Sequence, residues 1–109
     1  MSWLSKLFGG GAPRPTTPSV RCDGATAREL VAAGAQLLDV RTGVEHRQGH
    51  IPGSLNIPVD ELNRRLDEVA TDRPVVVYCR SGARSARAVQ ILQGQGLTDL
   101  HDLGPITAW

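Results

Sequence analysis

Short apolar runs alternate with helical patterns from residue 18 onward, and this alternation leaves few folds open. The clearest run, residues 74–78, reads PVVVY and shows no polar alternation. Runs of this kind are typical of strands that are buried on both faces of a parallel sheet. Because helical segments separate the runs, we predict an α/β fold in which an open parallel sheet is flanked by helices on both faces.

Local signals predict the individual elements. Residues 26–34 are expected to form a helix, because Thr26 and Glu29 have capping-box spacing and Gly34 ends the pattern. Residues 42–54 are expected to be a loop, since they contain three glycines and Pro52. The other expected helices are residues 59–70 and 83–96, the strands are 19–22, 36–40, 55–58, 74–78 and 97–103, and residues 104–109 begin a last turn or helix.

The start of the chain differs from the rest. Residues 9–19 mix Gly and Pro with no apolar spacing, so residues 1–17 are predicted to be a flexible N-terminal tail and linker. Residues 18–109 are predicted to be the folded domain. Residues 1–8 carry apolar side chains at the spacing of one helix face, and contact with a membrane or a partner is left open. The segment is too short to be a signal peptide.

Charge and cysteine content narrow the function. Twelve Lys and Arg against eleven Asp and Glu argue against nucleic-acid binding, which needs a basic excess. No run of about 18 apolar residues is present, so stable membrane insertion is not expected. Two cysteines are too few for a disulfide-stapled secreted domain, and a cytoplasmic protein is expected. Cys22 is expected to pack, although a role as resolving thiol for Cys79 stays open.

Cys79 directly follows the PVVVY run and is followed by RSGAR. The thiolate is the reactive form of cysteine, and cations and helix N-termini stabilise it. Arg80 and Arg84 supply positive charge, a helix beginning near Ala83 supplies an N-terminus, and Gly82 permits a tight bend with N–H groups facing an anion. The alternative is a cysteine that only packs, but two arginines beside such a residue would gain nothing.

Three stretches of the chain occur in an order that is specific as a set. They are LLDVRTGVEHRQGHIPGSLNIP at 37–58, VVVYCRSGARSARAVQIL at 75–92 and LGPITAW at 103–109. In these stretches the chain resembles the rhodanese family of sulfurtransferases, and specifically its single-domain members. The resemblance covers roughly residues 18–109, whereas any one stretch alone would be a weak signal.

The resemblance implies a reaction and the residues that perform it. Cys79 would be the catalytic cysteine, which takes a sulfur atom from a donor such as thiosulfate as a persulfide and passes it to cyanide or a thiol. A protein sulfur acceptor stays open. No metal and no organic cofactor is implied. The substrate-binding residues would be Arg80, Ser81, Gly82, Ala83, Arg84 and Ser85.

Three further residues are expected to support the site rather than to react. Arg41 and Glu45 are expected to form an ion pair that fixes their loop near the site. Asp39 ends a strand at the same edge of the sheet and is expected to orient a loop. His50 is expected to be packed and hydrogen-bonded rather than to act as a general base.

Two positions depart from the family pattern. His46 stands where the family usually has an aromatic residue, which is expected to loosen packing. Pro105 replaces the second glycine of the closing motif, so the backbone loses an N–H and its φ is restricted. These departures bear on packing and stability more than on the chemistry.

Other functions stay open on this fold. A phosphatase or arsenate reductase would also use a cysteine and an arginine, but four residues separate Cys79 from Arg84, one fewer than in those enzymes. The shorter loop suits one sulfur atom better than a tetrahedral oxyanion. A non-catalytic binding module typically lacks the cysteine that is present here. A carrier that delivers its persulfide to one specific protein is compatible with every residue named.

Overall fold

The computed structural model describes residues 20–109, and the predicted tail of residues 1–17 lies outside this range. The strands are β1 (Val20–Arg21), β2 (Gln36–Asp39), β3 (Leu55–Asn56), β4 (Val75–Cys79) and β5 (Leu100–Pro105). The α-helices are α2 (Gly24–Ala32), α3 (Gly43–Gln48) and α4 (Ala83–Gly94), and the 3-10 helices are η2 (Val59–Arg64), η3 (Leu66–Glu68) and η4 (Ile106–Ala108). Within residues 20–109, no helix has the length and apolar character needed to cross a membrane.

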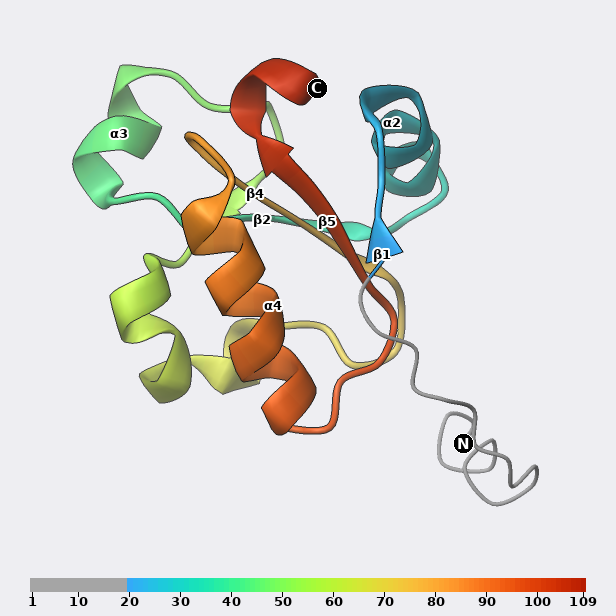
Figure 1. The fold of residues 1–109 in the computed structure, drawn as a ribbon, viewed down its shortest axis with the longest axis vertical. Coiled ribbons are helices and arrows are strands. Elements are labelled where there is room, and N and C mark those ends of the chain that lie inside the picture. Colours follow the sequence, from blue (N-terminus) through green and yellow to red (C-terminus); the bar gives the residue numbers. More distant parts are fainter. Residues whose placement is uncertain (1–19) are drawn as a thin grey trace.

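The five strands form one parallel sheet in the order β1-β5-β4-β2-β3. Helix α4 packs with η2 on one face of this sheet, and α2 covers the other (Figure 1). All five residues of the central strand β4 are buried, as its uninterrupted apolar run requires. The predicted open parallel sheet with helices on both faces is confirmed.

The residues of β4 alternate between two apolar cores. Val77 and Cys79 belong to the core beneath α4, together with Ala88 of that helix. Tyr78 belongs to the core beneath α2, together with Ala27. Because successive side chains of a strand point to opposite faces, Cys79 and Tyr78 act on different sides of the sheet.

The segment 42–54 contains a helix, α3, where a loop was expected. Thr42 and Glu45 form a capping box: the Thr42 hydroxyl accepts from the Glu45 N–H, and the Glu45 carboxylate accepts from the Thr42 N–H. The same Thr-x-x-Glu spacing is visible in the sequence, but the glycines around it favoured a loop. Gly49 ends α3 after six residues.

The predicted α-helix over residues 59–70 is instead two 3-10 helices. Val59 and Leu62 are both buried, and their spacing of three matches the three residues per turn of a 3-10 helix. Arg65 interrupts the segment with φ −127°, while its guanidinium bonds Glu61 and Glu68 on either side. The apolar spacing predicted the buried side correctly but not the helix type.

The carboxyl ends of β2, β4 and β5 meet at one edge of the sheet. Helix α3 and the C-terminal turn η4 lie at this edge, beside the loop that joins β4 to α4 (Figure 1). In open parallel sheets this is the edge where functional sites form.

Candidate active site

Cys79 is the last residue of β4 and is fully buried. On one side its neighbour is Pro105 of β5, its partner in the strand register. On the other side Val40 continues the ladder beyond β2 by donating its N–H to the Tyr78 carbonyl, at 3.0 Å. Val40 and Cys79 share the core beneath α4, so Cys79 lies between Val40 on the β2 side and Pro105 on the β5 side.

Residues 80–82, which we call the Cys79 loop, bend back over the sulfur. The Gly82 N–H donates to Cys79 Sγ at 2.9 Å. Gly82 has φ +109°, a left-handed conformation that glycine adopts without steric cost. Its carbonyl accepts from Ser85 Oγ at 3.1 Å and from the Ala86 N–H at 3.2 Å. The loop therefore holds an N–H group against the thiol by three hydrogen bonds.

Helix α4 begins directly after this loop. Its 12 residues start at Ala83, and Gly82 is its N-cap. The first N–H groups of a helix have no partner within it, and together with the helix dipole they favour negative charge. The thiolate is the nucleophilic form of a cysteine, so this position suits a reactive cysteine.

The predicted substrate-binding residues differ in their burial and in their partners. Arg80, Ser81 and Ala83 are exposed, whereas Ser85 is fully buried with its hydroxyl on the Gly82 carbonyl. Arg80 forms no ion pair within residues 20–109, so its charge is available at the mouth of the loop. Arg84 is half-buried and engaged with an acid from another element.

That acid is Glu45, and the predicted Arg41–Glu45 ion pair is wrong. Arg84 Nη1 bonds Glu45 Oε1 at 2.7 Å, and Nη2 bonds Oε2 at 2.9 Å. The Arg84 guanidinium, aided by the Thr42 N–H, lowers the pKa of Glu45 to about 2. Hydrogen bonding to Glu45, followed by the charge of Glu45, raises the pKa of Arg84 against the opposing effect of burial. Glu45 thus ties α3 to the first turn of α4.

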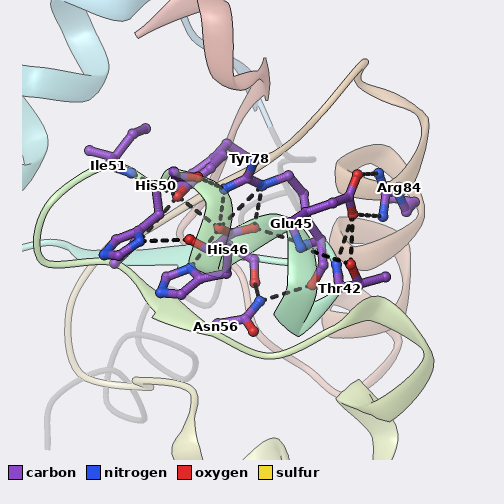
Figure 2. A network of polar contacts seen from close by, with 12 residues as sticks. Thr42, Glu45, His46, His50, Ile51, Asn56, Tyr78 and Arg84 are labelled. Atoms are coloured by element: carbon purple, nitrogen blue, oxygen red, sulfur yellow. Dashed lines mark hydrogen bonds and ion pairs between the residues drawn. The ribbon is translucent and has the colours of Figure 1, made fainter.

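Arg41 pairs with Asp39 instead. Asp39 is fully buried and accepts from Arg41 Nη2 at 2.8 Å, from Arg41 Nε at 3.0 Å and from the Arg41 N–H at 2.9 Å. Tyr78 Oη donates to the same carboxylate at 2.9 Å, and His46 Nδ1 lies 2.8 Å from it (Figure 2). Burial raises the pKa of Asp39, but these hydrogen bonds outweigh burial and lower it overall.

The Asp39 network fixes the position of α3. Arg41 Nη2 also donates to the carbonyl of Gly49, which ends the helix, at 2.7 Å. Asn56 Nδ2 donates to the carbonyls of Asp39 and Arg41 at 3.0 and 2.9 Å. Asp39 was expected to orient a loop, and its hydrogen bonds reach Arg41 and His46 on the segment that carries Glu45.

His46 and His50 stack with ring centroids 3.7 Å apart. His50 Nδ1 lies 2.8 Å from the His46 carbonyl, which can only accept, so this nitrogen is the donor. His50 is therefore hydrogen-bonded as predicted. His46 does not leave a gap: its ring bonds Asp39 on one side and packs on His50 on the other.

Sequence reasoning missed Tyr78. Its hydroxyl accepts from the Ile51 N–H at 3.1 Å, contacts Ser54 Oγ at 3.1 Å and donates to Asp39. The available signal was a tyrosine inside an apolar strand, since a buried hydroxyl needs partners. Tyr78 joins the network to β4 one residue before Cys79.

Cys22 lies apart from Cys79. It packs against the core beneath α2, on the face of the sheet opposite to the one that Cys79 occupies. Burial, followed by the charges of Asp102 and Asp23, raises the pKa of its thiol. A raised pKa disfavours the thiolate that a resolving cysteine needs, so both position and chemistry favour the packing role.

Two further features of the described residues lie outside this site. A hollow of about 330 Å³ is lined by residues 70–75 and 95–100. These segments precede β4 and β5, whereas Cys79 ends β4, so the hollow lies at the other edge of the sheet. Among residues 20–109, no group of three His, Cys, Asp or Glu side chains could hold a metal ion.

Comparison with known proteins agrees with this geometry. The profile of the rhodanese-like domain matches residues 24–109. Over 76 residues the chain is 45% identical to the uncharacterized protein YqhL of Bacillus subtilis, a match that spans 69% of this chain and 60% of that relative. Over 79 residues it is 37% identical to the thiosulfate sulfurtransferase GlpE of Shewanella oneidensis, spanning 72% and 78%. A rhodanese-related protein from Thermoplasma volcanium has a similar structure, with a TM-score of 0.72, 34% identity and coverage of 85% and 90%.

Proposed function

The chain belongs to the rhodanese-like domain family, and from that premise we propose that it is a sulfurtransferase that carries sulfur on Cys79. The observation that carries the proposal is the 2.9 Å contact from the Gly82 N–H to Cys79 Sγ, at the N-terminus of α4. An N–H donor and a helix N-terminus both favour the thiolate over the thiol, and the same donors would stabilise a persulfide anion.

The proposed reaction has two displacements. In the first, the Cys79 thiolate attacks the outer sulfur of thiosulfate, a new S–S bond forms at Sγ, and sulfite leaves with the electron pair of the broken S–S bond. In the second, cyanide or a thiolate attacks the outer sulfur of the persulfide, and Cys79 leaves as the thiolate. The products are thiocyanate or the persulfide of the acceptor. Each step is a thiol–disulfide type exchange and needs no metal or organic cofactor.

The two arginines have different proposed roles. Arg80 is exposed and has no ion pair among the described residues, which suits it to bind the sulfonate end of the donor. Arg84 shares its charge with Glu45, which suits it to hold the loop edge and to add positive potential near Sγ. Ser81, Ala83 and Ser85 contribute through the backbone that surrounds the sulfur.

A protein thiol is proposed as an acceptor beside cyanide, in the cytoplasm, where thiols stay reduced. Turnover that is slow with cyanide but fast with a protein thiol would identify delivery to that protein as the main role.

The test is thiocyanate formation from thiosulfate and cyanide by the wild type, Cys79→Ser and Cys22→Ser. We expect Cys79→Ser to be inactive and Cys22→Ser to retain wild-type turnover. Equal activity of wild type and Cys79→Ser would contradict the proposal, as would hydrolysis of a phosphate ester that depends on Cys79 in the absence of any sulfur transfer.

A further inference from the structure

Cys79 is enclosed from several directions. Val40 lies on the β2 side, Pro105 is the register partner on the β5 side, and Gly82 lies against the sulfur. Neighbouring strands lie about 4.8 Å apart, and the β4–β5 register shifts between Val77 and Tyr78 before it pairs Cys79 with Pro105, so the proline is the nearest residue of β5 to Cys79. The enclosure is complete enough to leave Cys79 with no exposed surface.

Pro105 also lies close to the Cys79 loop. A Cβ built on Gly82 would lie 3.8 Å from Pro105 Cδ, which is van der Waals distance. Gly82 is bonded through its N–H to Cys79 and through its carbonyl to Ser85 and Ala86. The loop residue next to the sulfur is therefore bounded by hydrogen bonds on one side and by the proline ring on the other.

The proline has little freedom to move aside. Its φ of −76° is fixed by the ring, it follows Gly104 in a left-handed conformation, and η4 begins at the next residue. Leu103, two positions earlier, is buried in the core beneath α2. A glycine at 105 would remove the ring and leave open space beside Gly82 and Cys79.

We propose that Pro105 is a specificity-determining residue that narrows the entry to Cys79. The entry admits donors whose reacting sulfur stands at the end of a small anion, such as thiosulfate, and it disfavours bulky donors such as peptide-sized persulfides. The inference rests on the proposed role of Cys79 as the reacting thiol. It is carried by the register pair Cys79–Pro105 and by the position of Pro105 Cδ, 3.8 Å from where a Cβ on Gly82 would lie.

The experiment compares alkylation of Cys79 by a small and a bulky reagent in the Cys22→Ser background. Iodoacetamide is the small reagent and fluorescein maleimide the bulky one. Pro105→Gly and Pro105→Ala both remove the ring, and Pro74→Ala at the far edge of the sheet is the matched control. Relief of a steric contact should raise the rate with fluorescein maleimide about tenfold and leave that with iodoacetamide within about twofold. Pro74→Ala should change neither.

The alkylation rates of the two Pro105 variants are compared only for folded protein, which a thermal unfolding experiment verifies. If Pro105→Gly does not fold, the comparison uses Pro105→Ala alone. An equal gain with both reagents would mean general loosening and would overturn the proposal. An unchanged ratio of the rate with fluorescein maleimide to the rate with iodoacetamide would also overturn the proposal. Sulfur loading from thiosulfate and from glutathione persulfide is measured in parallel. Absence of loading from thiosulfate would refute the proposed function, whereas the alkylation ratio would still decide the role of Pro105.

Discussion

Arg84 and Glu45 bind each other through two parallel hydrogen bonds, of 2.7 and 2.9 Å, although 39 positions separate them in the chain. The pair joins α3 to the helix that follows Cys79. It also means that the positive charge of Arg84 is matched by a carboxylate at the edge of the site. Substitution of either residue alone therefore changes the charge that an anionic donor meets.

Arg84→Ala would leave the Glu45 carboxylate without its cation beside the site. We expect kcat/KM for thiosulfate to fall about 100-fold, since like charge at a binding site costs several kcal/mol. In the double variant Arg84→Ala with Glu45→Gln, the repulsion is removed and the loss should be only about tenfold. Steady-state kinetics of the wild type, Arg84→Ala, Glu45→Gln and the double variant measure this. A double variant as slow as Arg84→Ala would show that Glu45 exerts no such charge effect.

The Glu45–Arg84 pair makes stability depend on acid pH. The folded-state pKa of Glu45, about 2, is below its ordinary value of 4.5, so the pair stabilises the fold above pH 4.5 and this contribution is lost as pH falls toward 2. Glu45→Gln keeps a side chain that completes the capping box but carries no charge. The difference in melting temperature between wild type and Glu45→Gln should shrink across this window. A constant difference from pH 5 to 2.5 would contradict the assignment.

Asp39 and Tyr78 are expected to matter for stability in a definite order. Asp39→Asn leaves the buried Arg41 guanidinium without its counter-charge and should destabilise the fold by about 3–5 kcal/mol. Tyr78→Phe leaves the buried Ile51 N–H unpaired and should cost about 1–3 kcal/mol. Urea unfolding gives both values. A larger loss for Tyr78→Phe would mean that the hydroxyl, and not the ion pair, is the centre of the network.

Comparing Gly82→Ala with Gly34→Ala separates the effect of backbone strain on stability from an effect on sulfur transfer. They have φ of +109° and +112°, and a Cβ at either position meets no clash. Alanine at each should therefore cost a similar amount of stability, about 1–2 kcal/mol. Only Gly82→Ala alters the N–H that contacts Cys79, so only this variant should lose sulfur transfer. Comparable sulfur transfer by the two variants would contradict the role proposed for the Gly82 N–H.

Much of the architecture was predictable because its signals are local. The PVVVY run, the cysteine after it and the helix that begins at Ala83 lie next to one another in sequence, and the structure has them in that arrangement. The capping box that starts α3 was equally local but was outweighed by the surrounding glycines. The 3-10 helices at 59–68 were not predictable from apolar spacing, which is compatible with both helix types.

Side-chain pairing across elements was the part that sequence could not supply. Arg41 and Glu45 were expected to form an ion pair, but Arg41 turns back onto Asp39, two positions earlier, and α3 directs Glu45 toward Arg84. Tyr78 was hidden for the same reason, since its partners come from β2 and from the segment after α3. The contacts of Glu45 with Arg84 and of Tyr78 with Asp39 join residues 39 positions apart and depend on the sheet order, which no local pattern encodes.

The most direct test of the central claim is intact-protein mass spectrometry after brief incubation with thiosulfate, followed by cyanide. Wild type and Cys22→Ser should each gain the mass of one sulfur atom, and cyanide should remove it. Cys79→Ser should gain nothing. A wild-type protein that gains no sulfur, while Cys79 still reacts with iodoacetamide, would contradict the claim that Cys79 carries sulfur from thiosulfate.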